Sequence, residues 1–140
     1  MRVVLDTSVI VAALRSQSGA SNQLLQLVAL RSFEILATPA LFLEYEEVIA
    51  REEHKAVHLL SDERIAAFLS ELAGMITPVR VYFQWRPQMQ DADDEMVLET
   101  ALNGNADIII THNTKDFLSV ASRFGVAVQN PGKALKEIRR

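Results

Sequence analysis

Short apolar runs alternate along the chain with longer stretches in which apolar residues recur at helical spacing. Residues 3–5 form the first apolar run, and the apolar positions of residues 9–14 follow it at the spacing of a helix. Residues 33–37 and 76–82 are predicted to be further strands, each preceded by a helical stretch. The centre of residues 107–111 is apolar without alternation, which is typical of a strand buried on both faces.

Polar residues mark the expected starts of several helices. Thr38 before Pro39 provides an N-cap followed by a residue suited to the first helical position. Asn22 is expected to cap the second helix, and Ser61 or Asp62 is expected to begin a later one.

The C-terminal part of the chain continues the alternation. The acidic residues 91–95 are expected at the start of a helix, where carboxylates favour the positive end of the helix dipole, and residues 103–104 at its end. Residues 116–124 are predicted to be helical and residues 126–128 to form the last strand. Asparagine and proline at residues 130–131 are expected to start a final helix.

Strands that alternate with helices, without tight hairpin signals, favour an α/β fold with a mainly parallel sheet sandwiched between helices. The length of 140 residues predicts one domain over residues 1–140. In such folds a ligand binds beyond the carboxyl ends of the strands, where the strand order changes direction.

Acidic and polar side chains follow two of the predicted strands. Asp6 comes directly after the first strand. Asn113 and Asp116 follow the strand of residues 107–111. The carboxyl ends of parallel strands share one edge, so these side chains are expected to lie near the predicted ligand site.

Two further carboxylates occupy positions that should otherwise be apolar. Glu44 lies three residues after Leu41 and four before Val48, along the inward stripe of its helix. Asp94 lies one turn before Val97 on an equivalent stripe. A buried carboxylate is costly without a partner, so each is expected to meet a cation.

Crowded carboxylates repel one another unless a multivalent cation holds them together. The chain contains no cysteine, and a set of oxygen ligands favours Mg²⁺ or Mn²⁺ over zinc or copper. Such a metal suits the hydrolysis of a phosphodiester. The predicted metal ligands and catalytic residues are Asp6, Glu44, Asp94 and Asp116.

The net charge of −4 is unusual for a protein that binds nucleic acid, because phosphate contacts normally require a basic face. Divalent cations at an acidic centre would make it locally less negative. Several basic residues could contact phosphate: Arg15, Arg51, Lys115, Lys133, Lys136, Arg139 and Arg140. The sequence does not show whether they lie on one face of the molecule.

Each acidic motif also has a simpler interpretation. Asp6 alone could be a helix N-cap, residues 91–95 alone a capped and solvated helix start, and Asp116 alone a cap. His54 and His58 are four residues apart, but no third ligand is evident, so surface histidines are favoured. The aromatic residues of segment 82–86 could stack bases, although packing into the core or a dimer contact is favoured.

Four segments together resemble the PIN domain family: residues 3–9, 43–49, 91–95 and 110–117. The resemblance extends over residues 1–131 and is strongest to the ribonuclease toxins, of VapC type, found in bacterial and archaeal type II toxin–antitoxin systems. It implies a three-layer Rossmann-like fold with a sheet of about five parallel strands. It also implies a divalent-metal-dependent endoribonuclease that acts on RNA, forms a homodimer and is blocked by a small antitoxin protein.

Carried over position by position, Asp6, Glu44, Asp94 and Asp116 match the acidic quartet of that family, and Ser8 and Asn113 match its supporting polar positions. Many relatives have asparagine where Ser8 stands, and some have an acid where Asn113 stands. The second departure leaves open whether Asp116 binds metal directly or through water. Asp91 and Asp93 could also take the role of Asp94.

Other functions receive less support from the sequence. A phospho-acceptor receiver domain would need an aspartate after the third strand and a lysine after the last, and residues 81–83 and 128–130 offer neither. A non-catalytic member of the family that binds RNA or protein is the second alternative. No membrane-spanning segment or signal peptide is evident, and a cytoplasmic location is expected.

Overall fold

In a computed structural model the chain is described over residues 1–84 and 87–139. Trp85 and Arg86, which belong to the aromatic segment considered for base stacking, lie outside the described residues. The strands are β1 Arg2–Leu5, β2 Glu34–Ala37, β3 Ile76–Pro78, β4 Ile108–Ile110 and β5 Ala127–Gln129. The helices are α1 Thr7–Arg15, α2 Ala20–Ala29, α3 Pro39–Ile49, α4 Glu52–His58, α5 Asp62–Met75, α6 Ala92–Asn103, α7 Thr114–Arg123 and α8 Pro131–Ile138.

The five strands form one sheet in the order β3-β2-β1-β4-β5, and every neighbouring pair is parallel. The chain moves outward from β1 to β2 and β3, then crosses back to β4 and β5 on the other side of β1. Val3 accordingly pairs with Ile35 on one side and with Ile108 on the other. This confirms the predicted parallel sheet and places the change of direction between the carboxyl ends of β1 and β4.

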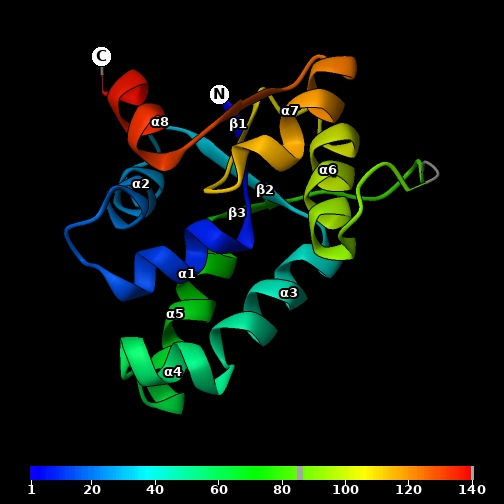
Figure 1. The fold of residues 1–140 in the computed structure, drawn as a ribbon. Coiled ribbons are helices and arrows are strands. Elements are labelled where there is room, and N and C mark those ends of the chain that lie inside the picture. The colour runs from blue at the N-terminus through cyan, green and yellow to red at the C-terminus, as the bar shows by residue number, and fades with distance from the viewer. Residues whose placement is uncertain (85–86, 140) are drawn as a thin grey trace.

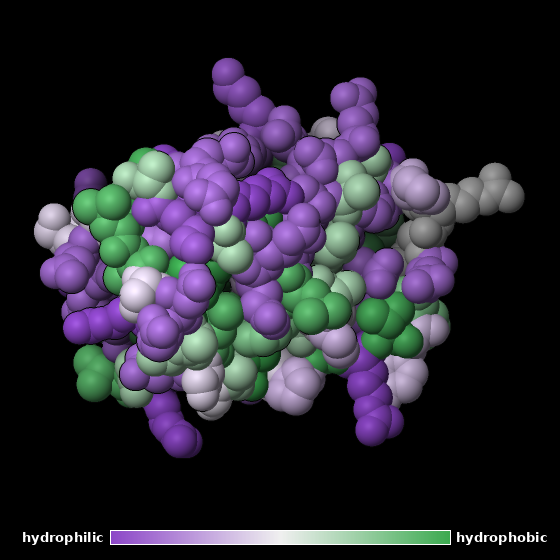
Figure 2. Space-filling view, turned by 90° about the horizontal axis from the view of Figure 1, so that it is seen from below, coloured by the Kyte–Doolittle hydropathy of each residue, from purple (hydrophilic) through white to green (hydrophobic). Residues whose placement is uncertain are grey.

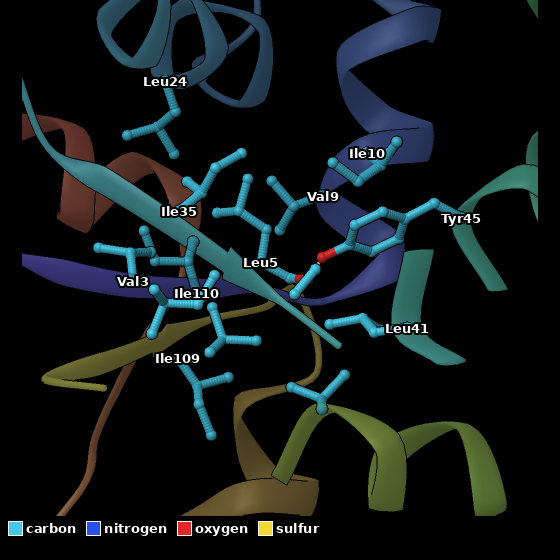
Figure 3. Close-up of a cluster of buried hydrophobic side chains, with 14 of the residues drawn as sticks. Val3, Leu5, Val9, Ile10, Leu24, Ile35, Leu41, Tyr45, Ile109 and Ile110 are labelled. Atoms are coloured by element: carbon cyan, nitrogen blue, oxygen red, sulfur yellow. The ribbon is translucent and has the colours of Figure 1, made fainter. Parts of the chain in front are cut away.

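Helices cover both faces of the sheet and make an α/β fold of three layers. Figure 1 shows α2 and α8 on one side of the strands and α6 and α7 on the other. α6 packs against β1, β2 and β4, and α3 bridges α1 and α6 near the carboxyl end of β1. β1 and β4 lie at the centre of the core, where Val3, Ile109 and Ile110 are fully buried (Figure 3).

Most of the predicted helix starts are confirmed. The Thr38 hydroxyl accepts a hydrogen bond from the Leu41 amide, and Ser61 and Asn130 cap α5 and α8 in the same way. The prediction for Asn22 is wrong: α2 begins at Ala20 after Gly19. The Asn22 amide group instead donates a hydrogen bond to the carbonyl of Ala13, which joins α2 to α1.

The other differences are one helix that was not predicted, α4, and the lengths of elements. β3 ends at Pro78 rather than extending to residue 82, because the following backbone is bound by the Asn103 side chain, which accepts hydrogen bonds from the amides of Tyr82 and Phe83. α7 begins at Thr114, so that Asp116 lies in its first turn. Within residues 1–84 and 87–139, no helix is both long enough and apolar enough to span a membrane.

Candidate active site

An open pocket of about 520 Å³ lies where β1 and β4 end, between α1, α3, α4 and α6. Figure 2 views the molecule from below, the side toward which β1 runs, and hydrophilic residues cover much of this face. The pocket is lined by carboxylates, by cationic or imidazole groups, and by polar and apolar residues of the surrounding elements: Asp6, Glu44, Asp91, Asp93, Asp94; Arg15, Arg51, His54, His112; and Thr7, Ser8, Val11, Ala12, Val48, Asn113.

Asp6 is held at the junction between β1 and α1. Its backbone amide donates to the carbonyl of Ile110, which continues the pairing of β1 with β4 by one residue. Its side-chain Oδ2 accepts hydrogen bonds from the hydroxyls of Ser8, at 2.9 Å, and Thr111, at 2.6 Å. The side chain is only 5% exposed, so these two hydroxyls stabilise a nearly buried carboxylate.

Glu44 is the least compensated of the acids. It is 6% exposed on α3, and its Oε1 is buried without a hydrogen-bond partner among the described residues. Burial raises its pKa above the usual range, and the negative charge of Asp93 adds to this increase, while Arg51 opposes it. An atom of this kind indicates a missing positive partner.

Asp94 lies across the pocket, in the first turn of α6. Burial raises its pKa to about 6, and the negative charges of Asp6, Asp91 and Asp116 contribute in that order. Asp91 is the N-cap of α6, and its Oδ1 accepts a hydrogen bond of 2.8 Å from the Asp93 amide. The structure therefore gives Asp91 a local structural role beside the pocket.

Asp116 is separated from the other three predicted ligands. It is exposed on α7 and lines a neighbouring pocket together with Asp91 and Asp94. Asn113, which precedes α7, lines the main pocket. The structure thus brings Asp6, Glu44 and Asp94 into one pocket, and places Asp116 close enough to influence the pKa of Asp94.

Two residues of this region were not identified in the sequence. The Thr111 hydroxyl donates to Asp6 and also accepts from the Asn113 amide. The Tyr45 hydroxyl donates to the carbonyl of Leu5, as Figure 3 shows, and so ties α3 to the end of β1. A hydroxyl directly after a buried strand was the available signal for Thr111, but Tyr45 resembles an ordinary core residue in its helical pattern.

The donor set is suited to a hard divalent cation, although it does not form a closed cage. In the described ranges no group of three or more acidic or histidine side chains is arranged as a ready-made metal site. Mg²⁺ commonly keeps several waters and needs only one or two carboxylates, so Glu44, whose Oε1 has no partner among the described residues, and Asp6 in the same pocket fit this ion. His54 and His58 do not form a joint site, because His54 contacts Arg15 while His58 bonds to the backbone of Ile49 and Leu60.

Comparison with known protein families gives a match over most of the chain. Residues 2–115 match the PIN domain family. No curated protein matches the chain. The matched segment includes every strand except β5, together with Asp6, Glu44 and Asp94. The chain therefore belongs to the PIN domain family.

Proposed function

We propose that this protein is a divalent-metal-dependent endoribonuclease that hydrolyses RNA phosphodiester bonds. PIN domains are generally nucleases, which supports a hydrolase acting on nucleic acid. The observation that carries the metal dependence is the buried Glu44 oxygen that has no partner among residues 1–84 and 87–139, in a pocket shared with Asp6 and Asp94. Three carboxylates gathered there without a cation would repel one another.

Asp6, Glu44 and Asp94 would hold Mg²⁺ or Mn²⁺, with Asp116 acting at the edge of the site. A metal bound there would lower the pKa of a water molecule and neutralise charge on the phosphate. Among the described residues, both hydrogen bonds to the Asp6 carboxylate fall on Oδ2, which leaves Oδ1 available to a cation. Ser8 and Thr111 thereby orient the carboxylate.

We further propose that the enzyme is the toxin of a type II toxin–antitoxin pair and acts in the cytoplasm as a homodimer. The support is the resemblance of four sequence segments to toxins of VapC type. On this proposal a small antitoxin protein restrains the nuclease by covering the acidic pocket. Co-expression with the product of an adjacent gene, followed by cleavage assays on the complex, tests this assignment.

Cleavage of a mixed single-stranded RNA by the purified protein tests the nuclease itself. We expect cutting with Mg²⁺ or Mn²⁺ and none with EDTA. Asp6→Asn should lower the rate on the order of 100-fold, because the metal contributes several kcal/mol to transition-state stabilisation. Glu63→Gln, an exposed acid of α5, is the matched control and should cut as the wild type does.

Undiminished cleavage by a folded Asp6→Asn variant, or cleavage in EDTA, would contradict the proposal. A second candidate function is a non-catalytic module that binds RNA or protein. It is favoured by the absence of a ready-made metal site in the described part of the chain. RNA binding without cutting, together with no thermal stabilisation by Mg²⁺, would support that alternative.

A further inference from the structure

Two arginines and a histidine line the same pocket as the acids, and we call Arg15, Arg51 and His54 the cationic wall. Arg15, the last residue of α1, and Arg51, the N-cap of α4, both line the pocket that contains Asp6 and Glu44. The Arg15 Nη2 lies 2.8 Å from Nδ1 of His54, which also lines the pocket. α1 and α4 pack against each other, so this wall is built from two contacting elements.

The geometry of the Arg15 contact leaves the charge of its guanidinium uncompensated. Arginine can only donate, so Nδ1 of His54 must accept, and the imidazole is then neutral with its proton on Nε2. No carboxylate of the described residues lies within ion-pair distance of Arg15. His54 therefore holds the guanidinium without neutralising it.

Arg51 is also weakly engaged. Its Nη2 lies 3.4 Å from Glu47 Oε1 in a pair whose side chains are 44% and 68% exposed. Such exposed pairs contribute little and exchange readily for a better anion.

We propose that Arg15, positioned by His54 and assisted by Arg51, binds an RNA phosphate adjacent to the scissile one. This inference rests on the proposed nuclease function and assigns a substrate subsite to it. The guanidinium group of an arginine can donate two parallel hydrogen bonds to the oxygens of one phosphate. It therefore provides a positive charge and also fixes the orientation of the phosphate. A strand that places one phosphate among the acids would place a neighbouring phosphate along this wall.

Arg140 lies outside the described residues, and the other basic residues considered in the sequence do not line the pocket. Lys115 on α7 does not line it. On α8, Lys133 and Lys136 do not line it either, and Arg139, which follows that helix, donates to Gln23 at 2.6 Å. Lys115 is exposed on a helix that begins close to Asn113, so it serves as a matched control for general electrostatic attraction.

The test measures binding and turnover separately. A fluorescent single-stranded RNA is titrated in Mg²⁺ onto proteins carrying Asp6→Asn to prevent cutting, and steady-state cleavage is measured in proteins that retain Asp6. Arg15→Ala should weaken binding about 10-fold and reduce the slope of log K against log salt concentration by about 0.7, because one phosphate contact is lost. KM should rise to a similar extent, while kcat changes less than about twofold.

Conservative variants distinguish positioning from folding. Arg15→Lys keeps the charge without the fork and should fall between wild type and Arg15→Ala. His54→Ala should weaken RNA binding, whereas His54→Gln, which retains an acceptor for Arg15, should recover most of it. Thermal unfolding should be unchanged in all of them, because Arg15 is exposed and His54 is only partly buried.

Unchanged RNA affinity in Arg15→Ala, or an equal loss in Lys115→Ala, would overturn the subsite. Capture of a polyglutamate peptide in preference to RNA, lost in Arg15→Ala, would also overturn it by assigning the wall to an acidic protein partner. The binding titration does not require the protein to cut RNA. If the wild-type protein cuts no RNA but its RNA affinity still depends on Arg15, the nuclease proposal is contradicted while the phosphate subsite stands.

Discussion

At Glu44 a carboxylate occupies a position where burial and its neighbours both oppose its charge. The nearby Asp93 raises the pKa of Glu44 further, through its charge and through a side-chain hydrogen bond, and Oε1 is left without a hydrogen bond among the described residues. If only the stability of the folded protein mattered, a neutral residue would be favoured at position 44. This placement is the one expected if Glu44 binds the proposed cation, since it does not favour the stability of the protein alone.

Glu44→Gln should therefore stabilise the protein in EDTA by about 1 kcal/mol. Glutamine has nearly the same shape as glutamate but no charge, so the substitution removes the repulsion without changing the packing. The same variant should lose both stabilisation by Mg²⁺ and cleavage of RNA. Thermal unfolding with and without Mg²⁺ measures both effects, with Glu63→Gln, an exposed acid of α5, as the control. A Glu44→Gln protein that is less stable in EDTA would show that the carboxylate has a structural partner.

Among the elements, α3 is joined to the end of β1 by a hydrogen bond from a buried tyrosine. Tyr45 is 2% exposed, and its hydroxyl donates to the carbonyl of Leu5, one residue before Asp6. Because Glu44 precedes Tyr45 on the same helix, this contact also determines where the Glu44 carboxylate lies relative to Asp6. Burial raises the pKa of Tyr45 well above its usual value, so the hydroxyl stays protonated as a donor.

Tyr45→Phe should lower the free energy of unfolding by about 1–2 kcal/mol, because a buried carbonyl loses its donor. It should also reduce kcat more than it raises KM, since the change moves a catalytic group and not a substrate contact. Phe42→Leu, one turn earlier on α3 and at the edge of the Tyr45 ring, is the control for lost packing alone. Equal effects of both substitutions on kcat would contradict a positioning role for the hydroxyl.

The elements also show which features were predictable. Helix starts at Thr38, Ser61 and Asn130 could be predicted, because each cap is a hydrogen bond to a residue three positions away. The start of α2 could not, because Gly19 provides no capping side chain. Tyr45 and Thr111 were missed for a different reason, since their partners lie 40 and 105 positions away and are brought close only by the sheet.

Across the whole molecule, the acidic centre couples stability to pH and metal. Folding raises the pKa of Asp94 from 3.8 to about 6, so the folded state prefers the protonated form. The stability gained in this way is fully present below the lower value and is lost as the pH rises through about 6. Bound cations should reverse this trend by favouring the ionised carboxylate.

In EDTA, Asp94→Asn should consequently become more stable relative to wild type as the pH rises from about 4 to about 7. Excess Mg²⁺ at pH 7 should reduce or invert that difference. Thermal unfolding of both proteins over this pH range, with and without Mg²⁺, provides the measurement. A difference that does not vary with pH would mean that Asp94 titrates alike in the folded and unfolded chains.

The position of β1 has a consequence for synthesis. Its neighbour β4 and the Thr111 hydroxyl that holds Asp6 come more than one hundred residues later in the chain. A nascent chain that has not yet reached Thr111 lacks the hydroxyl that holds Asp6 and the pocket residues His112 and Asn113, and long-range parallel pairing is slow to form. If the pocket is the active site proposed above, a nascent chain should therefore gain activity only late in its own translation.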